Sequence, residues 1–191
     1  MEEKLKQQPS DCIKIVLFGP ESTGKTTLSR QLAEHYQALW VPEYAREYLQ
    51  KKWDETKTIC QPEDLLPIAI GQMQLENELA KQANNILICD TDLLETKVYS
   101  EAYFSSTCDS MLEKYALENS YDLYFLTYID TPWTPDDLRD KPGERECMFQ
   151  AFENALNEAK RPYVLLRGNE KKRFKTATEY IDKLLEKRLC I

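Results

Sequence analysis

An apolar run at residues 13–18 leads directly into the loop G-P-E-S-T-G-K-T at residues 19–26, and an amphipathic segment follows it. The loop matches the pattern G-x-x-x-x-G-K-[ST], which sets two glycines, a lysine and a hydroxyl at a strand-to-helix turn. Glycines allow the backbone to approach a phosphate closely, and N–H groups at a helix N-terminus stabilise its charge. This segment therefore predicts a strand, a phosphate-binding loop and a helix.

Beyond the loop, short apolar stretches alternate with longer amphipathic ones, which is typical of an α/β domain on a mainly parallel sheet. We expect the fold class of P-loop NTPases, in the form of nucleoside and nucleotide kinases, with a five-stranded sheet flanked by helices. The expected strands are 13–18, 39–41, 86–89, 123–129 and 163–166. The expected helices are 24–36, 63–83, 92–104, 109–117, 144–160 and 175–189.

Composition limits the remaining possibilities. The chain has 191 residues, of which 42% are hydrophobic, and this suits a single domain over residues 1–191 with residues 1–11 as a flexible N-terminal tail. A net charge of −8 argues against a protein that coats nucleic acid or an anionic membrane. No stretch approaches the roughly 20 apolar residues of a membrane span, so we expect a cytoplasmic protein. The 6 cysteines form no C-x-x-C pair and indicate neither a zinc site nor a disulfide framework.

The loop itself predicts ATP and Mg²⁺ as cofactors. Lys25 can reach the β- and γ-phosphates of a nucleotide, while the Thr26 hydroxyl can ligate Mg²⁺. A second metal contact is expected from an acidic residue at the end of an apolar strand, and Asp90 follows I-L-I-C there. The loop residues expected to contact ATP are Gly19, Glu21, Ser22, Thr23, Gly24, Lys25, Thr26 and Thr27.

Asp92 lies two residues beyond Asp90, near the same strand end. It has three interpretations that the sequence alone does not separate: a second metal contact, a contact to the phosphoryl acceptor, or the N-cap of the next helix. The sequence thus leaves the role of Asp92 open.

A phosphate loop does not identify what accepts the phosphoryl group. A guanine-nucleotide switch is excluded because D-x-x-G and N-K-x-D motifs are missing where they are expected. A regulatory ATPase stays as an alternative. A small-molecule kinase needs an acceptor site with a carboxylate, a surface on which a ring can stack, and a basic lid that excludes water.

Candidates for the acceptor site follow the second expected strand, in P-E-Y-A-R-E-Y. Glu43 stands at a strand carboxyl end, where a group that orients a hydroxyl is expected in such sheets. Trp133 follows a proline in a loop, and either core packing or stacking on a ligand explains it.

The lid is expected at residues 137–145, where Arg139 and Arg145 flank a Pro-Gly break. Their guanidinium groups would reach the phosphates in a closed state, whereas the alternative is a solvated helix-turn. After the fifth strand, Gly168 either cradles the adenine or serves as an ordinary turn glycine.

Six segments follow one another along the chain: G-P-E-S-T-G-K-T-T-L, P-E-Y-A-R-E-Y, A-I-G-Q-M-Q, I-L-I-C-D-T-D, T-P-W-T-P-D-D-L-R-D and R-P-Y-V-L-L-R-G. Their succession closely resembles the ribosylnicotinamide kinase domain of bacterial NadR proteins. The resemblance covers nearly the whole chain from Ile13 onward. It implies transfer of the γ-phosphoryl group of ATP to the 5′-hydroxyl of nicotinamide riboside, which gives nicotinamide mononucleotide for NAD salvage.

The resemblance also implies roles for individual residues. Lys25 and Thr26 would contact ATP and Mg²⁺, and Glu43 with Asp90 or Asp92 would lie near the acceptor hydroxyl. Arg139 and Arg145 would act from the lid. The residues implied in binding the acceptor are Glu43, Gln72, Asp92 and, beside the pyridinium ring, Trp133. Tyr44 and Arg46, from the same segment as Glu43, are further candidates for acceptor binding.

The hypothesis from the sequence is thus an ATP-dependent kinase whose partners are small molecules, with no nucleic acid or membrane. A deoxynucleoside or nucleoside monophosphate kinase is the first alternative, because a Glu after the second strand and an arginine lid recur there. A regulatory ATP-binding module is the second. The oligomeric state is not predicted.

Overall fold

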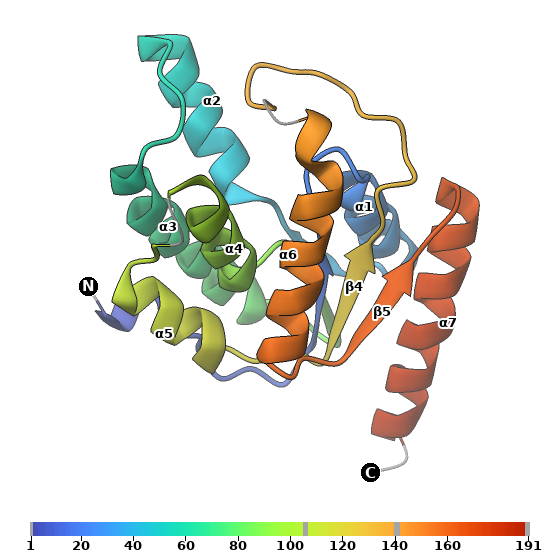
Figure 1. The fold of residues 1–191 in the computed structure, drawn as a ribbon. Coiled ribbons are helices and arrows are strands. Elements are labelled where there is room, and N and C mark those ends of the chain that lie inside the picture. The colour runs from blue at the N-terminus through green and yellow to red at the C-terminus, as the bar shows by residue number, and fades with distance from the viewer. Residues whose placement is uncertain (1, 105–106, 140–141, 190–191) are drawn as a thin grey trace.

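The computed structural model describes residues 2–104, 107–139 and 142–189, and its centre is a five-stranded parallel sheet (Figure 1). The strands lie in the order β2-β3-β1-β4-β5, and each neighbouring pair is parallel. Their bounds are β1 Ile13–Phe18, β2 Leu39–Val41, β3 Ile86–Asp90, β4 Leu123–Thr127 and β5 Tyr163–Leu166.

Helices cover both faces of the sheet (Figure 1). On one face pack α1 Lys25–Tyr36 and α7 Glu170–Leu189. On the other pack α3 Pro62–Ala80, α4 Leu93–Tyr103, α5 Ser110–Glu118 and α6 Arg145–Glu158. A further helix, α2 Tyr44–Thr56, packs against α3, and short 3-10 turns lie at Glu2–Lys4 (η1) and Pro142–Glu144 (η2).

The central strand shows why the chain forms this sandwich. Side chains of β1 alternate, so that Ile15 and Leu17 face α1 and α7 while Val16 and Phe18 face the other layer. All six residues of β1 are buried, as expected for a parallel strand covered on both sides. Phe18 makes edge contacts with Tyr124 at 5.6 Å and with Phe152 at 4.9 Å between ring centroids. Because both faces are filled, the strand ends are where this sheet can hold a ligand.

The fold predicted from the sequence is confirmed, with the largest differences in two helices; α3 also ends at Ala80 and β4 at Thr127, earlier than expected. Helix α2 was not predicted, because its sequence is mostly polar and none of its residues is buried. Helix α7 begins at Glu170, five residues before the expected start, with a basic run in its first turns. Of the helices in the described part of the chain, none is both long and apolar enough to cross a membrane.

The segment ahead of β1 differs from the flexible tail that we expected for residues 1–11, of which residue 1 lies outside the described part. Leu5 is fully buried in the core. The backbone N–H groups of Gln7 and Gln8 donate to the side chains of Asn119, at 3.2 Å, and Asn77, at 2.8 Å. Residues 2–12 are therefore fixed against α3 and the end of α5, because an apolar anchor and polar partners flank them.

Candidate active site

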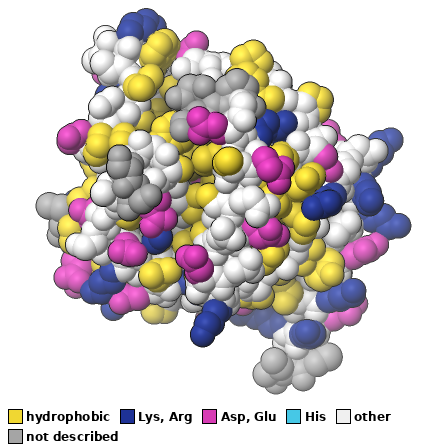
Figure 2. Space-filling view, viewed as in Figure 1, with side chains coloured by type: hydrophobic (Ala, Val, Ile, Leu, Met, Phe, Trp, Pro, Cys, Tyr) yellow, Lys and Arg dark blue, Asp and Glu magenta, His cyan; other side chains and the backbone are white. Residues whose placement is uncertain are grey.

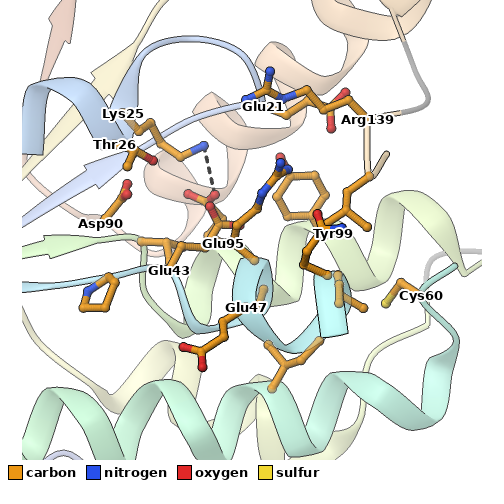
Figure 3. A pocket seen from close by; sticks show the side chains of 18 of the residues that line it. Glu21, Lys25, Thr26, Glu43, Glu47, Cys60, Asp90, Glu95, Tyr99 and Arg139 are labelled. Atoms are coloured by element: carbon orange, nitrogen blue, oxygen red, sulfur yellow. Dashed lines mark ion pairs between the residues drawn. The ribbon is translucent and has the colours of Figure 1, made fainter. Parts of the chain in front are cut away.

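A cavity of about 990 Å³ lies at the carboxyl ends of β1, β2 and β3 (Figure 3). One end is formed by the phosphate loop, residues 19–24, with the first turn of α1. We call this the donor end. The other end lies between α2, α3 and α4, and we call it the acceptor end. A single continuous space thus joins the phosphate loop to the region that follows β2.

The phosphate loop is tied to β4 behind it. Gly19 has a φ of +137°, and a Cβ there would lie 2.6 Å from Oγ1 of Thr127, so this position requires glycine. The hydroxyls of Thr23 and Thr127 share a hydrogen bond of 2.7 Å. The loop shape at the donor end is therefore set by close contact with the end of β4.

Arg173 supports the same loop from behind, and the sequence reading missed it. Its guanidinium donates to the carbonyls of Thr23, Tyr128 and Gly168 and pairs with Asp130, and only 3% of the residue is exposed. In the sequence it closes the run E-K-K-R, which is typical of a solvated helix face. No local pattern marks its burial, because its partners come from three other segments.

Gly168, expected either near adenine or in a turn, does not line the cavity. Its N–H donates to Oδ2 of Asp130 at 2.6 Å, and its carbonyl accepts from Arg173 at 2.9 Å. In the structure Gly168 belongs to the support of the phosphate loop.

Lys25 does not point into open space at the donor end. Its Nζ donates to the carbonyls of Gly19, at 2.6 Å, and Pro20, at 3.2 Å, and pairs with Oε1 of Glu95 at 3.1 Å (Figure 3). Burial raises the pKa of Glu95 to about 8, against the lowering effect of Lys25, and the carboxylates of Glu43 and Asp90 raise it further. Glu95 is a site residue that the sequence reading did not identify.

Asp90 and Thr26 fit a magnesium ion. Asp90 is fully buried, and its two carboxylate oxygens have no hydrogen-bond partner among the described residues. Burial, followed by the charge of Glu43, raises its pKa to about 6, while Thr26 and Lys25 lower it. The described residues hold no group of three or more His, Cys, Asp or Glu side chains suited to a metal. Mg²⁺ beside phosphates needs only one or two protein oxygens, and Asp90 and Thr26 are the residues that would supply them.

Asp92 serves as the N-cap of α4 and does not line the cavity. Its Oδ1 accepts from the Glu95 N–H at 3.0 Å, and its Oδ2 accepts from the Tyr124 hydroxyl at 2.6 Å. Burial raises its pKa to about 6. Of the three interpretations of Asp92, the structure supports the cap, and the expected catalytic and acceptor contacts are corrected accordingly.

Glu43 lies at the turn from β2 into α2 and lines the cavity beside Asp90 and Glu95 (Figure 3). Gln72 on α3 fixes this turn, because its Nε2 donates to the Pro42 carbonyl at 3.2 Å and its Oε1 accepts from the Tyr44 N–H at 2.8 Å. Gln72 lines the cavity too, but its amide is occupied by the backbone on both sides of Glu43. It acts on Glu43 through the turn.

Tyr44 packs outside the cavity, contrary to its expected role in acceptor binding. A Cβ on Gly71 would lie 2.1 Å from the Tyr44 ring, so the glycine in α3 allows the ring to approach. The contact holds the first turn of α2 against α3. Tyr44 is thus a packing residue of the acceptor end.

Arg46 and Arg139 line the cavity where α2 meets the lid segment, residues 137–145, of which 140–141 lie outside the described part. Arg46 donates to both carboxylate oxygens of Asp136, at 3.1 and 2.9 Å. Arg139 pairs with the same Asp136 at 3.1 Å and donates to the Thr134 carbonyl at 2.7 Å. One carboxylate therefore links α2 to the start of the lid segment.

Arg145 and Trp133 lie against the phosphate loop and do not line the cavity. Arg145 donates to the carbonyls of Thr131, at 2.9 Å, and Ser22, at 3.4 Å, and burial lowers its pKa. The Trp133 indole N–H donates to Glu21 at 3.4 Å. The expected place of Trp133 in the acceptor pocket is corrected: it belongs to the donor end.

Aromatic side chains of the acceptor end come from α4 and the residue after it. Tyr99, Tyr103 and Phe104 line the cavity, together with Leu65 and Ile68 of α3. The four-residue spacing of Tyr99 and Tyr103 sets both on one face of the helix. That spacing was the available signal, but it is equally typical of a helix face buried in a core.

The fold is that of a P-loop NTPase domain, with a cavity at the carboxyl ends of the strands. The chain belongs to the AAA domain family, whose model matches residues 14–173.

Among curated proteins, the chain is similar to the trifunctional NAD biosynthesis/regulator proteins NadR of Salmonella typhimurium and Escherichia coli. Each is 29% identical over 147 residues, which is 75% of this chain and 34% of the relative. The chain thus spans about a third of the length of these relatives.

Solved structures show the same fold. A NadR protein in complex with NR superposes with a TM-score of 0.76 at 22% identity over 91% of this chain and 51% of that chain. Deoxyadenosine kinase from M. mycoides with bound dATP gives a TM-score of 0.58 at 17% identity over 89% and 99% of the two chains. Thymidylate kinase from Candida albicans gives 0.62 at 16% identity over 92% and 93%.

Proposed function

We propose that the protein is an ATP-dependent kinase that phosphorylates the 5′-hydroxyl of nicotinamide riboside and yields nicotinamide mononucleotide. The observation that carries this proposal is the continuous cavity, which runs from the phosphate loop, past Glu43 beside Lys25 and Asp90, to an aromatic wall at its other end. Such a cavity can hold a triphosphate and a nucleoside at once. In-line transfer needs this arrangement, because catalysis of phosphoryl transfer is mainly positioning and electrostatics.

At the donor end the loop N–H groups and Lys25 would bind the triphosphate. Thr26 and Asp90 would hold Mg²⁺, which when bound neutralises charge on the phosphates. Arg139 lies at the edge of the cavity, from which it can approach the phosphates when the lid segment closes. Closure would exclude water and so favour transfer to the acceptor over hydrolysis.

At the acceptor end Glu43 would orient the 5′-hydroxyl. As the hydroxyl oxygen forms a bond to the γ-phosphorus, the bond to the β-phosphate oxygen breaks and ADP leaves. The hydroxyl proton passes to the Glu43 carboxylate. Gln72 keeps this carboxylate in place through its two backbone hydrogen bonds.

The charge of the acceptor end suits a cationic ring. Carboxylates of Glu43 and Glu47 line the cavity with the rings of Tyr99 and Tyr103. An aromatic face with nearby negative charge attracts a pyridinium, as in cation–π recognition. We therefore propose Tyr99, in place of Trp133, as the ring neighbour of the nicotinamide.

The similarity to NadR proteins supports this acceptor. One relative is named a trifunctional NAD biosynthesis/regulator protein, and one similar structure contains NR. Deoxyadenosine and thymidylate kinases share the fold, so a nucleoside or nucleotide acceptor is the alternative that this similarity favours.

The test is ADP release from MgATP, measured with no acceptor and with nicotinamide riboside, a panel of deoxynucleosides and a panel of nucleoside monophosphates. We expect release that depends on an acceptor, with the highest kcat/KM for nicotinamide riboside. A higher value for any deoxynucleoside or monophosphate would move the acceptor assignment to that compound. ADP release that no acceptor changes would replace the kinase with a regulatory ATPase.

A further inference from the structure

The hydrogen bonds of Lys25 leave it no donor for a ligand. An ammonium group has three N–H donors. In Lys25 they meet the carbonyls of Gly19 and Pro20 and the Oε1 atom of Glu95, at 2.6, 3.2 and 3.1 Å. Only 7% of Lys25 is exposed. A phosphate that binds Lys25 must therefore replace one of these partners.

Glu95 is the partner that can be replaced at the least structural cost. The two carbonyls belong to the phosphate loop itself, whereas Glu95 reaches Lys25 from α4 (Figure 3). Its position, three residues after the cap Asp92, is the one from which a capping-box glutamate turns back to its own helix. The Glu95 carboxylate instead crosses the donor end to Lys25. Its second oxygen, Oε2, is buried without a hydrogen-bond partner among the described residues.

The negative charges around the Lys25–Glu95 ion pair disfavour the binding of an anion. Glu43, Asp90 and Glu95 all act on the single ammonium of Lys25. Three carboxylates beside one ammonium leave a net negative site when all are ionised, and this is the place where the triphosphate of ATP would bind. Buried charges interact strongly because little water screens them.

We propose that Glu95 is a positioning residue for Lys25, which holds the ammonium inside the nucleotide-free loop so that the β- and γ-phosphates of ATP must displace a carboxylate. This rests on the proposed function in one respect only, that the displacing anion is the triphosphate of ATP. Glu95 then sets the affinity for nucleotide without touching the acceptor. The contact with Glu95 keeps Lys25 ordered. It also weakens nucleotide binding, because the phosphates must displace the Glu95 carboxylate.

Two other roles for Glu95 make different predictions. A purely structural ion pair would change stability when removed, but would not distinguish one nucleotide from another. A group that accepts the proton of the acceptor hydroxyl would change turnover, with nucleotide affinity unaltered. Only displacement by phosphates predicts an effect that depends on the β- and γ-phosphates.

The experiment measures binding of AMP-PNP and of AMP, both with Mg²⁺, by calorimetry at pH 8.5, where the Glu95 carboxylate is largely ionised. The wild type is compared with Glu95→Gln, which keeps the shape and removes the charge. Glu101→Gln is the matched control, because Glu101 lies on the same helix and pairs with Lys97 outside the cavity. We expect Glu95→Gln to bind AMP-PNP about tenfold more tightly and AMP as the wild type does.

Glu95→Asp, which retains the charge, should restore an affinity near that of the wild type. If Glu95→Gln fails to fold, Glu95→Ala must show the same tightening. Unchanged or weaker AMP-PNP binding in the neutral variants would overturn the proposal. Equal tightening for AMP would also overturn it, because a general field effect would then explain the change.

The test is independent of the acceptor assignment. A wild type that binds AMP-PNP, tightens in Glu95→Gln and yet does not phosphorylate nicotinamide riboside would leave the Glu95 proposal standing and remove the proposed acceptor. Normal phosphorylation of nicotinamide riboside by the wild type, with unchanged AMP-PNP binding in Glu95→Gln, would leave the proposed acceptor standing and remove the Glu95 proposal.

Discussion

The two ends of the cavity are built in different ways. The donor end comes mainly from one contiguous stretch, residues 19–27, which wraps from β1 into α1. The acceptor end is assembled from α2, α3 and α4, whose contributing residues are spread over about 60 positions of the chain. A contiguous loop carries its geometry in its own sequence, whereas an assembled surface depends on how separate helices pack.

The largest effect is expected at the donor end from Lys25→Ala. This change removes the only cation in residues 19–27, and we expect a loss of kcat/KM of about a thousandfold with the circular dichroism spectrum unchanged. Lys175→Ala is the control, since Lys175 lies on the surface of α7. Turnover at the wild-type rate in Lys25→Ala would separate the phosphate loop from the reaction.

At the acceptor end, Gln72→Ala should act through Glu43. The change leaves the Pro42 carbonyl and the Tyr44 N–H without their partner, which costs about 1–3 kcal/mol of stability. We expect kcat to fall about tenfold because Glu43 is less well fixed, while the Kd for AMP-PNP stays the same. Gln82→Ala, exposed beyond the end of α3, is the control. An equal loss of AMP-PNP affinity would mean that the two ends are not separable.

The pH dependence of stability should distinguish Glu95 from an ordinary carboxylate. Its folded-state pKa is raised to about 8 from an ordinary value of 4.5, so the folded protein retains a proton that the unfolded chain releases. The contribution to stability is therefore full below pH 4.5 and is lost as the pH rises toward 8. We expect the melting temperature of Glu95→Gln minus that of the wild type to be at least about 3 °C higher at pH 8.5 than at pH 5. A difference that does not change with pH would contradict the raised pKa.

The smallest effect is expected from Trp133→Ala. Because Trp133 contacts Glu21 and lies outside the cavity, the KM for the acceptor should change less than about twofold. Kinetics with nicotinamide riboside as the varied substrate measure this directly. A sharp loss of acceptor affinity with ATP affinity retained would return Trp133 to the acceptor end.

The sequence predicted the donor end well, for physical reasons. Steric limits on Gly19, the position of Lys25 and the Thr26 hydroxyl all follow from a short loop between a strand and a helix. Asp90 could be found because parallel strands end at one edge of the sheet. The support of this loop could not be found, since Arg173 reaches it from a helix some 150 residues away.

The acceptor end was predicted only in part. Glu43 was identified from its strand end, and Gln72 through family resemblance, although its amide turned out to bind the backbone. Asp92 was given catalytic and acceptor-binding roles in addition to that of the N-cap, because a strand-end carboxylate and a helix cap share one sequence pattern. Glu95 was missed for the converse reason: its spacing from Asp92 indicates a cap, and only the packing of α4 beside the loop turns it toward Lys25.

The molecule carries an excess of acidic side chains. The net charge of −8 is compatible with binding ATP, because the donor end would hold the nucleotide with backbone N–H groups and few cations. Acidic and basic side chains are mixed over the face shown in Figure 2, without a broad basic patch.

The measurement that tests the account most directly is the amount of nicotinamide mononucleotide formed from nicotinamide riboside and MgATP, compared with the ADP released in the same sample. The wild type and Glu63→Gln, an exposed carboxylate at the start of α3, should form the two products in equal amounts. Glu43→Gln should form both about a hundredfold more slowly, with AMP-PNP affinity retained. ADP without nicotinamide mononucleotide, or a Glu43→Gln variant as fast as the wild type, would contradict it.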